Sequence, residues 1–350
     1  MKKVFLFLLV IFPFSVKAIS ASAYIVMDAD SGRVLEGENI NSERLIASIS
    51  KIMTAIVAIE YGDIESVVKV DDSILKAYGS GIYIQVGEEL TLDDLLYGLM
   101  LRSGNDAALA IAKSVSGDIS SFVYLMNQKA LEIGMNNTLF LNPSGLEEND
   151  GNGNKSTVYD MALLMKYAMN NEHFRRITST KDIVVKSSYK TYKWVNKNKL
   201  LSSYEYCTGG KTGYTEKAKR TLVTSASNND MNLIVVTFND GNDFSDHKSL
   251  YEKYFNKYEK RNVLKKDELV EENIYVKNEF NILVNNEDNI KLEKIIDNKD
   301  KFYNGDIVGR INVYLNNEKI GYRYLYYKKE LVSKEKGFLS KLLDILKFWD

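Results

Sequence analysis

The stretch LIASISKIMTAIVAIEYG, residues 45–62, is apolar and helical in rhythm, yet Ser48, Ser50 and Lys51 stand near its start. Ser48 and Lys51 are three residues apart and therefore share one helix face. In a first helical turn, the positive end of the helix dipole favours a developing serine alkoxide. A lysine amine whose pKa is lowered by burial and nearby cations can take the serine proton. The pair is thus a candidate nucleophile and general base; alternatively, Ser48 caps the helix and Lys51 is solvated.

Two further stretches carry polar residues that fit this chemistry. LRSGNDAALA places Ser103, Gly104 and Asn105 in a tight turn between helices, and GGKTGYT places Lys211 and Thr212 at the start of a β-strand. A Ser-x-x-Lys pair, a Ser-x-Asn turn and a Lys-Thr-Gly strand, in this order, are typical of active-site serine enzymes that recognise penicillin. One motif alone is weak evidence, but the ordered set indicates a single composite site.

The elements that must hold this site follow from the spacing of apolar residues. Strands are predicted at 23–28, at 33–41 as a hairpin partner, and as two core strands within 220–240 joined by an Asn-Asn turn. Helices are predicted at 45–62, 92–100, from about 106, at 121–134, at 156–171 with Ser156 as N-cap, and at 246–260. Helices in the middle with strands at both ends predict an α+β domain with one antiparallel sheet.

Composition describes a folded, enzyme-sized chain. The 350 residues are 45% hydrophobic and 27% charged, with a net charge of −1, which lacks the basic excess of a nucleic-acid-binding protein. Cys207 is the only cysteine, so no intramolecular disulfide can form. With only two histidines besides, a Cys/His zinc cluster is excluded, and we expect neither a metal nor another cofactor.

Both ends of the chain indicate export and membrane contact. Residues 1–18 have two lysines, an apolar run and a small final residue, as in a secretory signal; a membrane span is the alternative, but the run is short and contains Pro13. Beyond Arg261, short Val/Ile/Tyr segments predict a small β domain. The predicted parts are a signal at 1–18, a catalytic domain at 19–261, an all-β domain at 262–333, and an amphipathic helix at 334–350 that lies on a membrane or docks on a partner.

Over nearly its whole length the sequence resembles the serine-type D-alanyl-D-alanine carboxypeptidases, low-molecular-mass penicillin-binding proteins of the peptidase S11 type. The phrases that carry the resemblance are ASISKIMTA, VGEELTLDDLLYGLMLRSGNDAALAIA, LNPSGLEENDGNGNKSTVYDMALLMKYAM and GGKTGYT. It implies the penicillin-recognising α+β fold, with a five-stranded antiparallel sheet, a helical lobe and a cleft between them. It also implies an exported peptidase that removes the last D-alanine of peptidoglycan stem peptides at the outer face of the cell membrane and is inhibited by β-lactams.

The resemblance implies a role for each motif residue. The catalytic residues are Ser48 as nucleophile, Lys51 as general base, Ser103 as proton donor to the departing amine, Asn105 as ligand of the substrate amide and of Lys51, and Lys211 as positive charge near Ser103. The substrate-binding residues are Thr212 for the terminal carboxylate, Gly213, Tyr214, whose backbone N–H joins that of Ser48 in the oxyanion hole, and Thr215 as a further contact.

A few residues differ from the pattern of the family that the sequence resembles, and they bear on whether the protein is a peptidase or has another function. Gly104 in the middle of the turn favours a peptidase over a β-lactamase, and Glu147 and Glu148 stand in a loop-like context unlike the glutamate that activates water in one β-lactamase class. Lys219 stands where relatives often have glycine, and residues 241–250 lack an arginine that many relatives carry. The alternatives are a β-lactamase or D,D-endopeptidase on the same scaffold, and a non-catalytic protein that senses β-lactams or binds the cell wall.

Three other features are predicted to be structural. His247 is not needed for catalysis, because lysine replaces histidine in this chemistry. Cys207 is expected to pack within its strand rather than act as a second nucleophile. The segment YRYLYY, residues 322–327, is expected to be a strand face rather than a carbohydrate-binding stripe.

Overall fold

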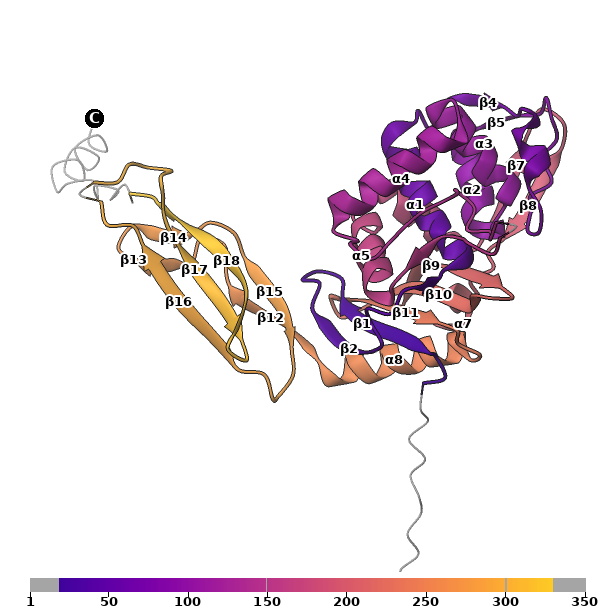
Figure 1. Ribbon diagram of the computed structural model, residues 1–350. Coiled ribbons are helices and arrows are strands. Elements are labelled where there is room, and N and C mark those ends of the chain that lie inside the picture. Colours follow the sequence, from indigo (N-terminus) through magenta and orange to yellow (C-terminus); the bar gives the residue numbers. More distant parts are fainter. Residues whose placement is uncertain (1–18, 149, 300, 330–350) are drawn as a thin grey trace, which may run out of the picture. The chain divides into compact units, whose positions relative to one another are not determined.

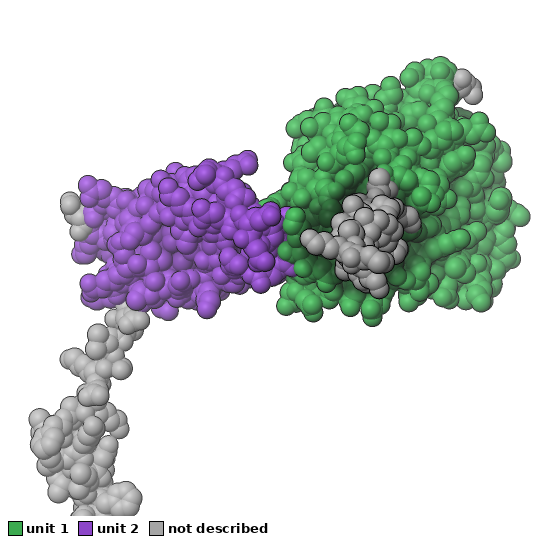
Figure 2. Space-filling view, turned by 90° about the horizontal axis from the view of Figure 1, so that it is seen from below, with its two compact units in different colours: residues 1–257 green, residues 258–350 purple. Residues whose placement is uncertain are grey.

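The computed structural model describes residues 19–148, 150–299 and 301–329. The chain forms two compact units, residues 1–257 and 258–350, which Figure 2 colours separately. The predicted signal at 1–18 and the predicted helix at 334–350 lie outside the described residues. The boundary expected after Arg261 falls inside the first strand of the second unit, β12 (Glu259–Leu264).

The first unit is built on a five-stranded antiparallel sheet, as the resemblance implies. Its order is β2-β1-β11-β10-β9. The strands are β1 (Ala23–Asp28), β2 (Val34–Glu38), β9 (Cys207–Thr215), β10 (Lys219–Asn228) and β11 (Met231–Phe238). The hairpin predicted between β10 and β11 is present, but its turn is centred one residue beyond the Asn-Asn pair, on Asn229 and Asp230. Both residues have positive φ, which suits a tight hairpin. The sheet thus joins the first and last strands of the unit.

Helices cover both faces of this sheet (Figure 1). Above it lie α1 (Lys51–Tyr61), α2 (Leu92–Arg102), α3 (Asn105–Ser116), α4 (Ile119–Ile133), α5 (Val158–Ala168) and α6 (Glu172–Ser179), whereas α8 (Asp243–Lys257) runs below it. The smaller elements are β3 (Arg44–Leu45), η1 (Ala47–Ser50), β4 (Val67–Lys69), η2 (Asp72–Lys76), β5 (Glu89–Thr91), β6 (Lys155–Ser156), β7 (Asp182–Lys186), β8 (Thr191–Val195) and α7 (Leu200–Ser203). Within the described ranges, no helix is long and apolar enough to cross a membrane.

Some helix bounds differ from the sequence-based expectation. Helix α8 starts at Asp243 rather than at residue 246 and ends at Lys257 rather than at residue 260, because Glu259 and Lys260 pair with β15 as part of β12. The helix expected over 45–62 is a 3₁₀ turn, η1, followed by α1. The N-cap of α5 is Thr157, whose side chain accepts a hydrogen bond from the Asp160 amide (3.0 Å), and the prediction of Ser156 was wrong. Ser156 belongs instead to β6, and its hydroxyl lies 2.7 Å from that of Thr138.

Helix α1 forms the centre of the core between the helical lobe and the sheet. Every residue from Lys51 to Ala58 is buried, so the first two turns of α1 have no solvent-exposed face. A helix that is buried all round needs apolar neighbours on every side, and these come from α2, α3, α4, α5 and α6. Each large apolar side chain buried here stabilises the fold by about 1.5–3 kcal/mol. The same packing keeps water away from Lys51.

In the second unit, all the described elements are strands. One sheet pairs β12 with β15 (Phe280–Val284), and the other has the order β13-β14-β18-β17-β16. The second sheet consists of β13 (Leu269–Glu271), β14 (Ile274–Val276), β16 (Ile290–Ile296), β17 (Ile307–Leu315) and β18 (Glu318–Tyr327). Asn316 and Asn317 form the predicted turn between β17 and β18 and have positive φ. The segment YRYLYY lies on β18, as expected of a strand face.

Candidate active site

The nucleophile candidate lies in the turn before α1. Ala47 has a φ of 52°, a left-handed conformation that costs a residue with a Cβ free energy. Two hydrogen bonds hold this turn: Ser50 Oγ donates to the Ala47 carbonyl (2.8 Å), and Thr221 Oγ1 on β10 donates to the Ile46 carbonyl (2.9 Å). Neither η1 nor α1 uses Ser48 as its cap. The alternative interpretation of Ser48 as an N-cap was therefore wrong, and its side chain lines a cleft.

Lys51 is fully buried and points at Ser48. Its Nζ lies 3.1 Å from Ser48 Oγ, 2.7 Å from Asn105 Oδ1 and 2.5 Å from the Ser144 carbonyl oxygen. Burial, followed by the positive charge of Lys197, lowers the pKa of Lys51 to about 7, although a nearby carboxylate opposes the shift. The alternative of a solvated lysine was therefore wrong, and near neutral pH much of this amine is free to accept a proton.

The Ser-Gly-Asn turn connects α2 to α3 and has two functions. Ser103 ends α2 with a φ of 63° and lines the cleft. Gly104 is the N-cap of α3, so Asn105 is the first helical residue. The Asn105 amide group donates from Nδ2 to the Tyr78 carbonyl (2.6 Å), which leaves Oδ1 directed at Lys51. The turn thus brings a second hydroxyl to the cleft and fixes the lysine amine.

Lys211 is the central residue of β9 and not, as the sequence pattern predicted, at the start of the strand. Its side chain is buried, and its Nζ donates to the Thr212 carbonyl (2.7 Å). Burial, together with the charges of Lys51 and Lys197, lowers the pKa of Lys211 well below its usual value. The site therefore holds two buried amines that both resist protonation.

Gly213 lets β9 pass close to the nucleophile. A Cβ at this position would lie 2.4 Å from Thr221 Oγ1 and 3.1 Å from the backbone nitrogen of Ser48. Only glycine allows this approach, since real Cβ contacts are longer. The strand then continues to Tyr214, whose ring is largely exposed over the cleft. The backbone nitrogen of Ser48 therefore lies close to the Gly213 segment of β9.

Thr215 is engaged by the chain itself. Its hydroxyl donates to the Glu147 carboxylate and accepts from the Ala218 amide (3.1 Å). Glu147 also accepts a hydrogen bond from the Tyr78 hydroxyl at its carbonyl oxygen (2.7 Å). Thr215 therefore fastens the loop that carries Glu147 to the end of β9. Lys219, between β9 and the rest of β10, has a φ of 60°, a conformation that glycine adopts most readily.

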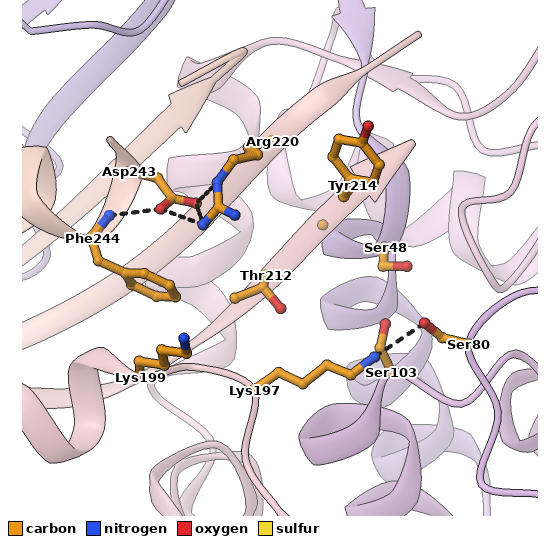
Figure 3. A pocket seen from close by; sticks show the side chains of 11 residues that line it. Ser48, Ser80, Ser103, Lys197, Lys199, Thr212, Tyr214, Arg220, Asp243 and Phe244 are labelled. Atoms are coloured by element: carbon orange, nitrogen blue, oxygen red, sulfur yellow. Dashed lines mark hydrogen bonds and ion pairs between the residues drawn. The ribbon is translucent and has the colours of Figure 1, made fainter. Parts of the chain in front are cut away.

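The cleft has a volume of about 300 Å³ and gathers residues from distant parts of unit 1 (Figure 3). Its lining consists of Ser48, Ser80, Ser103, Lys197, Lys199, Thr212, Gly213, Tyr214, Arg220, Asp243 and Phe244. The sequence motifs include none of the three cations in this set, Lys197, Lys199 and Arg220. Arg220 pairs with Tyr214 across the β9–β10 ladder, so the alternation of β10 is the signal that places it on the cleft side.

Two of these cations, Arg220 and Lys197, are held differently. The Arg220 guanidinium makes a double contact with the Asp243 carboxylate, at 3.0 Å from Nε and 2.6 Å from Nη2. Lys197 Nζ donates to the Ser80 hydroxyl (3.1 Å), and Figure 3 shows it reaching toward Ser103. Lys197 belongs to the short connection between β8 and α7, where no sequence pattern indicated a functional residue.

His247 and Cys207 are structural, as expected from the sequence. His247 is buried on α8 between the hydroxyls of Thr224 (2.7 Å) and Thr237 (3.1 Å), and burial lowers its pKa to about 3. Burial raises the pKa of Cys207, at the start of β9, to about 11, so its thiol is a poor nucleophile near neutral pH.

Together, a serine next to a buried lysine, a second serine and a Lys-Thr-Gly strand define an active-site serine enzyme of the penicillin-recognising class. The comparison with known families agrees with this class. Residues 12–242 match the peptidase S11 family, D-alanyl-D-alanine carboxypeptidase, and the chain belongs to this family.

Individual relatives support the assignment. D-alanyl-D-alanine carboxypeptidase DacF of Bacillus subtilis is 37% identical over 225 residues, which are 62% of this chain and 57% of that protein. DacB2 of Mycobacterium tuberculosis is 36% identical over 61% of this chain and 73% of its own length. The match thus spans little more than half of the Bacillus relative.

Solved structures show the same fold. A D-alanyl-D-alanine carboxypeptidase from Mycobacterium tuberculosis superposes with a TM-score of 0.65 and 32% identity, over 68% of this chain and 92% of that chain. Penicillin-binding protein 5 from Haemophilus influenzae gives a TM-score of 0.75 at 24% identity, over 89% of this chain and 98% of that chain, so the likeness in fold reaches into the second unit.

Proposed function

We propose that this protein is a serine D,D-carboxypeptidase that removes the terminal D-alanine from peptidoglycan pentapeptide stems. The observation that carries the proposal is the contact of 3.1 Å between Ser48 Oγ and Lys51 Nζ. The lysine is fully buried, and its pKa is lowered to about 7. A hydroxyl next to an unprotonated amine is an activated nucleophile.

In the acylation step, Ser48 Oγ attacks the carbonyl carbon between the two D-alanines while its proton moves to Lys51. The negative charge that develops on the carbonyl oxygen is stabilised by the backbone N–H groups of Ser48 and Tyr214, and the loss of one such donor costs about 10²–10³ in rate. The close approach that Gly213 permits supports this arrangement. Asn105 binds the substrate amide and keeps Lys51 directed at the nucleophile.

The leaving group then departs with a proton. Ser103, which lines the same cleft, passes a proton to the amine of the last D-alanine as the C–N bond breaks, and Lys51 replenishes the proton of Ser103. Water next attacks the ester carbon and gives one proton to Lys51. The bond between this carbon and Ser48 Oγ then breaks, Lys51 returns the proton to Ser48 Oγ, and the shortened peptide is released as its carboxylic acid. Lys211 contributes to the electrostatic environment of Ser103.

The terminal carboxylate of the substrate binds to Thr212 and Arg220. The chain lacks the arginine that many relatives carry within 241–250, and Arg220 provides a guanidinium on the same cleft from β10 instead. The Asp243 carboxylate holds this guanidinium in place by accepting hydrogen bonds from Arg220 Nε and Nη2. A planar guanidinium matches a carboxylate with two parallel hydrogen bonds. Tyr214 flanks the bound peptide, and Thr215 acts indirectly because its hydroxyl is held by Glu147.

A β-lactam acylates Ser48 by the same attack and leaves an ester that water reaches poorly. The decisive experiment measures the intact mass of the chain from residue 19 onward after incubation with penicillin, together with the D-alanine released from a peptide ending in D-Ala-D-Ala. We expect a stable adduct that is absent in Ser48→Ala, and release of D-alanine by the wild type. Rapid loss of the adduct with hydrolysed drug would indicate a β-lactamase. Cleavage of crosslinked stems would indicate an endopeptidase, and an adduct without D-alanine release a sensing protein.

We further infer that the protein acts on the outer side of the cell membrane, with residues 1–18 as export signal and residues 334–350 as membrane-associating helix. The apolar and charged pattern of these segments supports this. The all-β unit then forms a separate domain between the catalytic domain and the helix. Deletion of residues 334–350 is expected to move the protein from the membrane fraction to the soluble extracytoplasmic fraction; unchanged fractionation would contradict the role of this segment.

A further inference from the structure

Four lysine side chains belong to the active-site region, and they differ in their access to water. Lys51 and Lys211 are fully buried, Lys197 is half-buried, and Lys199 is exposed. Protonation of a buried amine costs free energy because the ammonium loses its hydration. A positive charge in this region is therefore most stable on the lysines that keep contact with water.

Few opposite charges compensate these amines. The carboxylate that acts on Lys51 is that of Asp106, and its oxygens accept hydrogen bonds from the amides of Ile82 (3.0 Å) and Tyr83 (2.6 Å). Asp243, whose carboxylate lines the cleft, is paired with Arg220. Lys51 Nζ otherwise contacts uncharged oxygens of Ser48, Asn105 and Ser144. The positive charge of Lys197 lowers the pKa of Lys51, and both amines lower the pKa of Lys211.

We propose that Lys197 is a positioning residue whose ammonium keeps Lys51 unprotonated and ready to act as base. The ammonium is held in the cleft by its hydrogen bond to Ser80 Oγ, and the Ser80 carbonyl oxygen accepts a hydrogen bond from the backbone N–H of Asn105 (2.8 Å). This chain of contacts ties the charge to the turn that holds Lys51. A fixed like charge disfavours a second proton nearby.

The inference rests on the proposed function and deepens it. The resemblance assigns the positive charge near Ser103 to Lys211, but Lys211 is buried and its pKa is lowered by burial, Lys51 and Lys197. Lys197 therefore carries the charge, and Lys211 is a second amine under its influence. Burial and the charge of Arg102 also lower the pKa of Lys197. At alkaline pH Lys197 therefore loses its charge and its effect on the pKa of Lys51, but Lys51 is then unprotonated in any case.

The test compares the pH dependence of acylation by penicillin, measured as the second-order rate constant, in the wild type, Lys197→Met, Lys197→Arg and Lys199→Met. The acylation rate constant rises with pH as Lys51 loses its proton. In Lys197→Met we expect the midpoint of this rise to lie about one pH unit higher than in the wild type. The rate at pH 7 then falls about tenfold or less and recovers at pH 9. Lys197→Arg keeps the charge and should keep the midpoint. Lys199→Met removes a charge from the exposed rim and should not shift it.

An equal loss of rate at every pH in Lys197→Met would overturn the proposal, since it would mean that Lys197 only contacts the β-lactam or supports the fold. A midpoint that moves in Lys197→Arg as much as in Lys197→Met would overturn it too, because charge would then not be the cause. If Lys197→Met does not fold, Lys197→Gln replaces it in the same comparison. Failure of the wild type to form any adduct is a different result, which contradicts the proposed function itself.

Discussion

Two lysines of the same unit, Lys51 and Lys129, are both almost completely buried, with 0% and 4% of their surface exposed. Lys129 Nζ lies 2.7 Å from the carboxylate of Glu60 and 2.6 Å from that of Glu132. Burial disfavours its charged form, but the hydrogen bonds to Glu132 and Glu60 outweigh this and raise the pKa of Lys129. Lys51 meets uncharged oxygens instead, and its pKa falls. Partner charge, rather than burial alone, thus decides whether a buried lysine holds its proton.

The two surroundings also differ in what they connect. Lys129 on α4 bonds to Glu60 at the end of α1 and lies 5.4 Å from the ring of Tyr167 on α5, so it ties three helices together. Lys51 connects the start of α1 to the turn before α3 and to the loop at Ser144. One lysine stabilises the lobe, and the other is available for proton transfer. Three measurements can break or sharpen this distinction, and a fourth tests the binding of the substrate carboxylate in the same cleft.

The largest effect is expected for Lys51→Met. Loss of a general base lowers rates by about 10²–10⁴-fold, so we expect acylation by penicillin to fall by about 10³-fold. Stability should change little, because an apolar side chain of similar length replaces an amine that resists protonation, and this gain offsets the loss of the hydrogen bonds to Asn105 Oδ1 and the Ser144 carbonyl. Mass spectrometry over time and thermal unfolding measure the two effects. Acylation within tenfold of the wild type would remove Lys51 from the proposed mechanism.

The second measurement is the pH dependence of acylation in the wild type. The pKa of Lys51 is lowered to about 7, so the unprotonated base predominates above this pH. The rate should therefore rise about tenfold per pH unit below 7 and level off above it. A flat profile between pH 5 and 9, in a protein that remains folded over this range, would show that no group with this pKa acts in acylation.

A smaller effect is expected for Arg220→Gln. Because a charge-assisted hydrogen bond contributes about 1.5–3 kcal/mol, and because Asp243 already engages part of the guanidinium, we expect KM for a D-Ala-D-Ala peptide to rise about tenfold. The matched control is Arg175→Gln, which removes an exposed arginine of α6. Steady-state kinetics separate KM from kcat. An unchanged KM in Arg220→Gln would leave carboxylate binding to Thr212 alone.

These residues also show what the sequence could and could not predict. Ser48, Lys51, Ser103, Asn105 and Lys211 stand in short, ordered motifs, and the structure brings all five into one region. Helices and hairpins followed from local periodicity and turn residues, as with the β10–β11 and β17–β18 turns. The sequence pattern did not distinguish Thr157 from Ser156 as a cap, because both residues form N-caps well.

The missed features depend on contacts between distant segments. Arg220 lines the cleft because of the register between β9 and β10. Lys197 lies in a connection whose position is fixed by the hydrogen bond from the Lys197 backbone amide to the Leu101 carbonyl (3.0 Å). The contact between Glu147 and Thr215 joins residues from a loop and a strand end that no local pattern relates. Such contacts are set by tertiary packing, which a single sequence does not reveal.

The smallest effect on activity is expected for Lys129→Met, and it completes the comparison. The substitution leaves Glu60 and Glu132 without their cation and loosens the junction of α1, α4 and α5, so the free energy of unfolding should fall by about 1–3 kcal/mol. The acylation rate at 25 °C should stay within twofold of the wild type. Lys113→Met, at an exposed site on α3, controls for the loss of a surface charge. A drop in the acylation rate of Lys129→Met as large as that of Lys51→Met would mean that the two lysines belong to one coupled network. If Lys51→Met loses activity and Lys129→Met loses stability, the charge of the partner groups determines which of the two functions each lysine has.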